Sequence, residues 1–517
     1  MEPAPPRRRF EEVVPLAFAF ITLAVHLVAN RGYGYFRDEF YYLACSDHLA
    51  AGYVDHPPLS ILLLRLNHLV LVDLLSAGES LSVLRLLPAL AGAAAIFVTG
   101  VLVREMGGGR REQAVACGAF LIAPLYLAID NYYSMNSFDL LFWTLAALLV
   151  VRLVNSEGRR GWVPLGFVLG FGLLNKISVL WLGFGLFAGI LLTPARRWLR
   201  SPGPWIAGAI AALIFSPHVV WQVRNGWPTI EFMRNATGSK MADVSIPGFF
   251  AGQILVMHPL NAPLWIAGLI SLLFMKEGRR WRLVGIIYVA VLALLLLGGK
   301  SRAGYLGPAY PPLLAAGAVA FLRPASERRK WIAPAAVAIQ IAGGAVLAPF
   351  ALPVLPVETF IAYQKALGVS PSTEERKDVG PLPQQYADMF GWEEMVGAIG
   401  RVYQGLPDAE RPHTAIYVQN YGEAGAVDFF GRAWGLPRAW SGHNNYWYWW
   451  RGGDGLTTVL ILGGRREDHL RSFQSVEEAA IFDTSYAMPY ERHLTIWIAR
   501  GLKAPPAELW PLTKNFS

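Results

Sequence analysis

Long runs of apolar residues, separated by short polar turns, dominate the first two thirds of this chain. A helix needs about 20 mostly apolar residues to cross the hydrocarbon core of a bilayer. The pattern predicts about eleven such spans, near residues 13–30, 81–104, 113–130, 137–154, 161–175, 177–193, 204–221, 249–275, 282–298, 305–322 and 331–350. The apolar segment 59–75 also carries charged and polar residues, which favours a helix at the membrane interface over a span.

The pattern changes after residue 350, where prolines punctuate a charged linker and no further long apolar run follows. Short apolar segments predict strands at 414–418, 457–463 and 493–499, with helices around 384–404 and 421–433. We therefore expect a polytopic α-helical membrane domain over 1–350, with its first external loop at 31–80. A C-terminal α/β domain is expected over 351–517, and its strand order is not defined by the sequence.

Basic residues occupy every second connection between the expected spans. They are Arg7–Arg9; Arg104, Arg110 and Arg111; Arg152, Arg159 and Arg160; Arg196, Arg197 and Arg200; Lys276, Arg279, Arg280 and Arg282; and Arg323, Arg328, Arg329 and Lys330. Because positive charge is enriched in cytoplasmic loops, these connections and the N-terminus are placed in the cytoplasm. We expect a multi-pass protein of the plasma or inner membrane, with loop 31–80 and the C-terminal domain outside.

Composition agrees with a membrane protein. Apolar residues make up 54% of the 517 and charged residues 16%, with a mean hydropathy of +0.36, whereas soluble domains average about 45–50% and about 25%. The two cysteines exclude a disulfide scaffold. The net charge of +8 follows from the cytoplasmic loops, so we expect no nucleic-acid partner. No phosphate-binding loop is present in the sequence, which argues against ATP-driven transport by this chain.

The first external loop holds the main candidate chemistry. Asp38 and Glu39 stand just beyond the first span, where ionisable groups are costly unless they are solvated, paired or functional. Tyr42 follows at helical spacing, and Asp55 and His56 precede two prolines that stiffen the backbone. The alternative is a set of ordinary exposed loop side chains. A rigid acidic corner at the membrane surface favours a functional site.

These motifs resemble a known family. An acidic pair after the first span, followed by GYVDHPPL (52–59), is similar to the dolichyl-phosphate-mannose protein mannosyltransferases and the bacterial aminoarabinose transferases, a family-39-like group of the GT-C superfamily. Further similar segments are IDNYYSMNSFDLLFW (129–143), GFGLLNKISVLWLG (170–183), FSPHVVWQVRNGWPTIEF (215–232), GGKSRAGYLGPAYPPL (298–313), NYGEAGAVDFFG (420–431) and WSGHNNYWYWW (440–450). The resemblance implies a GT-C fold whose external loops bind a lipid-phosphate-linked sugar.

Chemistry supports the same interpretation. An enzyme at the outer face has no access to cytoplasmic nucleotide sugars, so a polyprenyl-phosphate sugar (hexosyl or pentosyl) is a suitable donor. The acceptor would be a hydroxyl of a glycolipid or protein. A single displacement inverts the anomeric carbon and needs a base for the acceptor proton. Asp38 is our candidate base, with Glu39 orienting the acceptor or tuning that base; the sequence leaves open which of the two takes the proton.

Stabilising the leaving phosphate requires cations. Lys176, Lys300 and Arg302 fall at outward helix ends in the predicted topology, with Tyr305 in the same motif as the last two. The alternative is that these lysines extend to the interface as structural anchors.

Four polar residues of the second external motif are candidates for binding sugar hydroxyls: Asp130, Asn131, Asn136 and Asp139. Helix capping is the alternative, above all for Asn136. Asp55 and His56 are candidates for lining the acceptor side or for binding a divalent metal ion, although the histidines show no zinc-ligand spacing.

Two further alternatives stay open. The aromatic run 446–450 fits either an aromatic belt at the membrane surface or a surface on which sugars stack. The whole chain could instead be a transporter or lipid flippase, which predicts internal repeats and charges at the bilayer midplane. We see no clear repeat, and the ionisable residues cluster near the outer surface.

Overall fold

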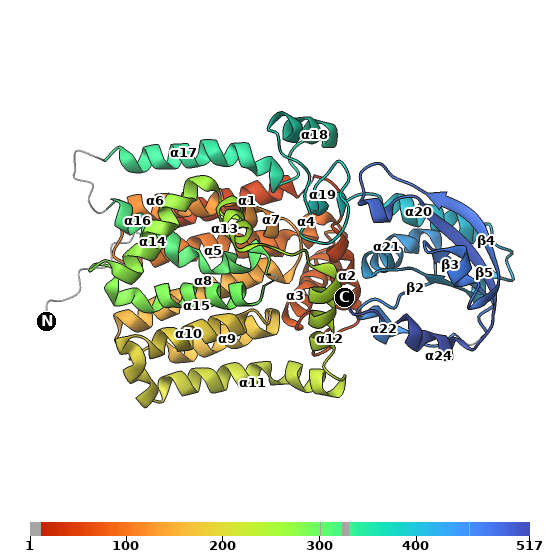
Figure 1. Ribbon diagram of the computed structural model, residues 1–517, viewed down its shortest axis with the longest axis horizontal. Coiled ribbons are helices and arrows are strands. Elements are labelled where there is room, and N and C mark those ends of the chain that lie inside the picture. The colour runs from red at the N-terminus through yellow and green to blue at the C-terminus, as the bar shows by residue number, and fades with distance from the viewer. Residues whose placement is uncertain (1–11, 31, 300, 323–329, 454) are drawn as a thin grey trace. The chain divides into compact units, whose positions relative to one another are not determined.

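The computed structural model describes residues 12–30, 32–299, 301–322, 330–453 and 455–517 (Figure 1). The chain divides into two compact units. Unit 1 comprises Met1–Arg31, Gly78–Val220 and Asp243–Val354, and unit 2 comprises Gly32–Ala77, Trp221–Ala242 and Leu355–Ser517. The first loop and a short central segment therefore belong to the same unit as the C-terminal residues.

Unit 1 is helical. Its α-helices are α1 (Val13–Ala29), α4 (Leu81–Leu84), α5 (Leu86–Glu105), α6 (Arg110–Leu121), α7 (Pro124–Ile129), α8 (Met135–Asn155), α9 (Trp162–Asn175), α10 (Val179–Leu191), α11 (Gly203–Arg224, which ends in unit 2), α13 (Ile246–Val256), α14 (Ala262–Phe274), α15 (Arg282–Leu297), α16 (Pro311–Leu322) and α17 (Ile332–Leu347). Short 3₁₀ segments join several of them, among them η2 (Pro194–Arg200), η4 (Pro259–Asn261) and η6 (Ala303–Ala309).

Within the described residues, five helices are long and apolar enough to cross a membrane, or up to eight if each bent pair is one span. The bent pairs turn by 105° between α10 and η2, by 94° between α13 and the η4–α14 segment, and by 61° between η6 and α16. The helices agree with a multi-pass membrane protein. The predicted topology, and the assignment of 1–350 and 351–517 to membrane and external domains, stay predictions.

Prolines explain where continuous apolar runs are divided. The expected span 113–130 is two helices, since α6 ends at Leu121 and α7 starts at Pro124. Proline clashes with the preceding turn and disfavours a helical residue before it. The same reasoning applies at Pro259, which begins η4 after the left-handed His258 (φ 73°). Hydropathy alone does not mark these breaks.

Small residues allow close helix packing in unit 1. A Cβ on Gly268 of α14 would lie 2.0 Å from the Leu313 carbonyl oxygen, and one on Gly317 of α16 would lie 2.0 Å from that of Leu264. Backbones at this separation tolerate no side chain, as in other membrane helix pairs. The reciprocal glycines therefore fix α14 against α16.

Unit 2 combines helices with one sheet. Its α-helices are α2 (Arg37–Asp47), α3 (Leu59–Asn67), α12 (Pro228–Asn235), α18 (Val357–Ala366), α19 (Gln384–Ala387), α20 (Trp392–Gln404), α21 (Tyr421–Phe430), α22 (Tyr446–Trp449), α23 (Arg466–His469) and α24 (Pro506–Leu509). The strands are β1 (Thr414–Tyr417), β2 (Ala439–Trp440), β3 (Thr458–Leu462), β4 (Phe473–Phe482) and β5 (Leu494–Leu502). The segment 59–75 contains α3 and a π-helix, η1 (His68–Leu74).

The strand order is β2-β1-β3-β5-β4, with β1 parallel to both neighbours and β5 antiparallel to β3 and β4. The three predicted strands are present, and β3 is buried along its whole length. The sequence missed β4, an edge strand whose alternation is interrupted by a bulge between Glu478 and Ala480.

Candidate functional site

The first turn of α2 separates the two acidic candidates. The Glu39 carboxylate accepts the Phe36 N–H at 2.8 Å and is fully buried, so it caps the helix. Asp38, one residue earlier, keeps 34% of its side chain exposed. Both acids are also favourable at a helix N-terminus. The geometry leaves Asp38 as the accessible carboxylate of the pair.

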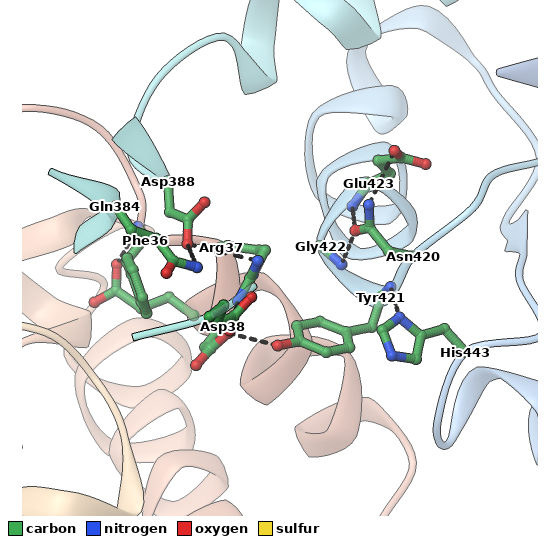
Figure 2. A network of polar contacts seen from close by, with 12 residues as sticks. Phe36, Arg37, Asp38, Gln384, Asp388, Asn420, Tyr421, Gly422, Glu423 and His443 are labelled. Atoms are coloured by element: carbon green, nitrogen blue, oxygen red, sulfur yellow. Dashed lines mark hydrogen bonds and ion pairs between the residues drawn. The ribbon is translucent and has the colours of Figure 1, made fainter. Parts of the chain in front are cut away.

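Asp38 meets a residue 383 positions away. The Tyr421 hydroxyl donates to Asp38 Oδ1 at 2.8 Å, and Arg37 Nε lies 3.5 Å from the same oxygen (Figure 2). Tyr421 is the first residue of α21, and its ring also lies under the Arg37 guanidinium. A hydroxyl donor and a guanidinium thus orient one carboxylate.

Arg37 is itself held by buried acids. Its guanidinium lies 3.6 Å from Asp388 and 3.7 Å from Glu375, and it donates to the Tyr490 hydroxyl at 2.6 Å. Burial raises the pKa of Asp388 to about 6, although the nearby Arg37 charge opposes that rise. Several partners therefore fix the guanidinium beside Asp38.

The second acidic candidate, Asp55, is bound by Tyr41, which lies beside Tyr421. The Tyr41 hydroxyl donates to Asp55 at 2.9 Å, and the Tyr41 and Tyr421 rings lie 4.8 Å apart. Burial raises the pKa of Asp55; the neighbouring His56 and the Tyr41 hydrogen bond oppose that rise, and the negative charge of Asp38 adds a smaller contribution to it. The two carboxylates are therefore held by adjacent tyrosines and interact electrostatically.

His56 is fixed beside Asp55. Its ring stacks on Tyr42 at 4.9 Å, and its Nδ1 lies 3.0 Å from the Pro57 carbonyl oxygen. A carbonyl only accepts, so Nδ1 carries a proton, and Nε2 lies 4.0 Å from Asp55 Oδ1. Histidine ligands of metals commonly donate their other nitrogen to a carbonyl in this way.

The N-terminus of α21 is fixed as firmly as that of α2. Asn420 Oδ1 accepts the N–H groups of Gly422 and Glu423 at 2.9 and 3.0 Å, and the Tyr421 N–H donates to His443 Nδ1 at 3.3 Å (Figure 2). Burial lowers the pKa of His443 to about 3, so this ring is neutral. These contacts position the hydroxyl of Tyr421.

Unit 1 holds a separate polar cluster. Lys176 Nζ donates to Asn136 Oδ1 at 2.8 Å and lies 3.5 Å from the buried Asp139, which also accepts from Ser178 at 2.8 Å. The Tyr305 ring centroid is 6.0 Å from the same ammonium group. Lys176 is thus held by an acid and an amide.

The capping alternative for Asn136 is wrong. Ser134 is the N-cap of α8, and its hydroxyl accepts the Asn136 backbone N–H at 3.2 Å. The Asn136 side chain contacts Lys176 instead.

The other candidates of unit 1 are Asp130, Asn131, Arg302 and Lys300. Asp130 and Asn131 are each 1% exposed, and the Asp130 carboxylate packs over Gly92 of α5. Arg302 precedes η6 and is half-buried. Lys300 lies outside the described residues.

The structure therefore groups the candidates within each unit. Unit 2 brings together Asp38, Glu39, Tyr42, Asp55 and His56, and unit 1 brings together Asn136, Asp139, Lys176 and Tyr305. The sequence pattern did not indicate Arg37 and Tyr421 as partners of Asp38. Tyr421 lies in the motif at 420–431, and Arg37 precedes the acidic pair, so both stood in segments already singled out.

Comparison with known proteins identifies the fold. Residues 55–221 match the family described as Dolichyl-phosphate-mannose-protein mannosyltransferase. The crystal structure of ArnT from Cupriavidus metallidurans bound to undecaprenyl phosphate superposes with a TM-score of 0.59 at 15% identity, covering 94% of this chain and 97% of that one. This chain has the fold of ArnT. The family resemblance predicted from the sequence is confirmed.

A second structure of ArnT and a sequence relative are also similar to this chain. The apo form of the same ArnT gives a TM-score of 0.58 at 14% identity, over 94% of this chain and 97% of that one. The lipid A galacturonosyltransferase RgtD of Rhizobium johnstonii is 26% identical over 237 residues. That alignment covers 45% of this chain and 48% of RgtD, so the chain matches about half the length of this curated relative.

Proposed function

We propose that this protein is a membrane glycosyltransferase that moves a sugar from a polyprenyl-phosphate donor to an acceptor hydroxyl. The observation that carries the proposal is the accessible Asp38 carboxylate, held by Tyr421 and Arg37 in a chain with the fold of ArnT. The ArnT structure bound to undecaprenyl phosphate and the family match at 55–221 support a lipid-linked donor. The same likeness favours an enzyme over a transporter or flippase.

The reaction is one displacement at the outer face of the membrane. Asp38 accepts the proton of the acceptor hydroxyl while the oxygen of that hydroxyl bonds to the anomeric carbon. The bond from that carbon to the phosphate oxygen breaks, the polyprenyl phosphate leaves with the electron pair, and the configuration inverts. Lys176, Lys300 and Arg302 are our proposed cations for the leaving phosphate, with Asp130, Asn131 and Asp139 as proposed sugar contacts.

Asp55 and His56 are our proposed ligands of a divalent ion. His56 Nε2 lies 4.0 Å from an oxygen of Asp55, a separation that one shared ion can bridge. Among the described residues no three histidine, cysteine or acidic side chains converge, so water or substrate would complete the coordination. Such an ion would supply positive charge beside the acceptor.

The experiment is transfer by purified full-length protein in nanodiscs with a polyprenyl-phosphate sugar. We expect Asp38→Asn to reduce turnover by about 10³-fold or more, the order lost when a general base is removed, without changing protein yield or melting temperature. The matched control is Glu394→Gln, which neutralises an exposed acid on α20. Full turnover in Asp38→Asn would refute the proposal that Asp38 is the base.

A further inference from the structure

Unit 2 contains a pocket that has no role in the reaction proposed above. It has a volume of about 380 Å³, within the range of about 300–1,000 Å³ typical of small-molecule sites. Its walls come from the end of α2, from α21 and β2, from α22 and from the residue after α24: Asp47, His48, Asp428, Arg438, Trp440, Trp449, Trp450, Arg451 and Trp510, with smaller contributions from neighbouring residues. Every lining residue belongs to unit 2.

Three tryptophans pack together to form one wall of the pocket. Trp450 and Trp510 stack at 5.2 Å with 13° between their planes, and Trp440 meets both edge-on. The Trp510 indole donates to the Trp447 carbonyl at 3.0 Å, which fixes its orientation. The Trp450 indole N–H is buried and, among the described residues, has no hydrogen-bond partner. An aromatic face beside this N–H donor is suited to bind a ring that carries hydroxyl groups.

Polar side chains on the other walls are paired and oriented. Asp428 accepts the Tyr446 hydroxyl at 3.0 Å and the Ala439 N–H at 2.8 Å, while Arg438 lies 3.3 Å from Asp47. The lining carries two arginines and two carboxylates, which leaves it close to neutral. A balanced lining gives no net attraction to a charged ligand.

The aromatic rings of 446–450 are partly covered by other residues of unit 2. Tyr446 is buried, and Trp447, Trp449 and Trp450 are half-buried, packing on Phe516, Tyr446 and Trp510 respectively. Residues of a membrane belt place their rings in the lipid headgroup region. Packing around a concavity favours binding of a ligand over contact with lipid.

We propose that this pocket binds an uncharged hexopyranose ring belonging to the acceptor glycan. The apolar face of the ring stacks on Trp450, and its hydroxyls bond to Asp428, Arg451 and the Trp450 N–H. Asp47 and Asp38 lie nine residues apart on α2, a distance of about 14 Å along the helix. The pocket is thus separate from the proposed base. Assigning the ring to the acceptor rests on the proposed function; sugar binding itself does not.

Saturation-transfer NMR on full-length protein in nanodiscs tests the binding, with methyl α-glucopyranoside, methyl α-galactopyranoside and methyl α-mannopyranoside as probes. We expect at least one to receive saturation on one face of its ring. Trp450→Ala and the exposed Arg451→Ala should each weaken that binding about 10-fold or more, and Trp450→Phe should retain part of it. The matched control is Trp434→Ala, which removes a ring packed on Gly400 of α20.

Unchanged binding in both Trp450→Ala and Arg451→Ala, or no binding of any probe to the wild type, overturns the proposal. Quenching of Trp450 by brominated lipids also overturns it, because the run would then lie in the membrane interface. Displacement of the bound glycoside by a polyprenyl-phosphate sugar would assign the pocket to the donor and overturn the acceptor assignment. Asp38→Asn should bind the probes normally, so loss of transfer and loss of sugar binding are distinguishable.

Discussion

At the scale of single residues, the hydroxyl of Tyr421 determines how Asp38 is presented. A hydrogen bond to a charged group contributes about 1.5–3 kcal/mol, so its loss should lower the turnover rate about 10- to 100-fold. We expect Tyr421→Phe to have this effect on kcat with little change in KM, because the bond acts on the base and not on substrate binding. Steady-state kinetics with the full-length protein measure kcat and KM separately.

A matched variant separates positioning from stability. Tyr486→Phe removes another tyrosine–carboxylate bond, from Tyr486 to the exposed Glu358 at 2.8 Å. It should leave kcat unchanged. Equal kinetic losses in Tyr421→Phe and Tyr486→Phe, or a loss confined to KM, would contradict the role assigned to Tyr421.

The buried pair Glu423 and Glu491 makes stability depend on pH. Asn420 donates to both carboxylates at 2.9 Å, and burial raises the pKa of each above the usual 4.5. Between about 4.5 and the raised folded values, the native state holds more protons than the unfolded chain. Stability therefore falls as pH rises through this window.

Glu491→Gln removes one of these ionisations while keeping an oxygen for Asn420. The wild-type melting temperature should fall between pH 5 and pH 8, and the fall should be smaller in Glu491→Gln, by about 2–4 °C for each kcal/mol recovered. Differential scanning fluorimetry of the purified protein measures both slopes. Glu394→Gln is the control and should keep the wild-type slope. Identical slopes in all three proteins would refute the claim that the buried Glu423 and Glu491 make stability depend on pH.

At the scale of elements, the site depends on the close contact of α2 with α21. A Cβ on Gly425 would lie 2.7 Å from Phe40 Cβ and 2.8 Å from its carbonyl group. Because part of that contact is backbone, the helices must separate to admit a side chain. Any separation lengthens the bond between Asp38 and Tyr421, which join the same two helices.

We therefore expect Gly425→Ala to reduce kcat by about 10-fold or more, since a misplacement of about 1 Å has cost about 10²-fold in other enzymes. Gly238→Ala is the matched control, because a Cβ at Gly238 meets nothing within 4 Å. The measurement is turnover together with melting temperature. Wild-type turnover in Gly425→Ala would show that the helix contact tolerates a methyl group.

The elements also show what a sequence can predict. Continuous apolar segments predicted the helices of unit 1 and the buried strand β3, because burial leaves a local pattern of apolar residues in the sequence. The bend at His258 and the edge strand β4 left no such pattern. The bond between Asp38 and Tyr421 joins residues 383 positions apart and depends on tertiary packing alone. Both residues lay in conspicuous motifs, but no local rule pairs them.

At the scale of the whole molecule, the proposed function requires unit 2 to face outward, where a lipid-linked sugar is the suitable donor. The distribution of arginine and lysine predicts this orientation. Both native cysteines are buried and free, so Cys45→Ala with Cys117→Ala gives a background without reactive thiols. Two exposed positions then report on the two faces: Ser475 on β4 and Arg159 in the connection after α8.

In intact cells or right-side-out spheroplasts, we expect a membrane-impermeant maleimide to label Ser475→Cys at once. Arg159→Cys should be labelled only after the membrane is permeabilised, because its connection carries the cytoplasmic charge. The cysteine-free parent should stay unlabelled in both conditions. The reverse pattern would put Asp38 and its tyrosine partner on the cytoplasmic side, since Ser475 and Asp38 belong to the same compact unit. The acceptor hydroxyl and the donor would then have to be sought among cytoplasmic molecules, and transfer at the outer face would be excluded.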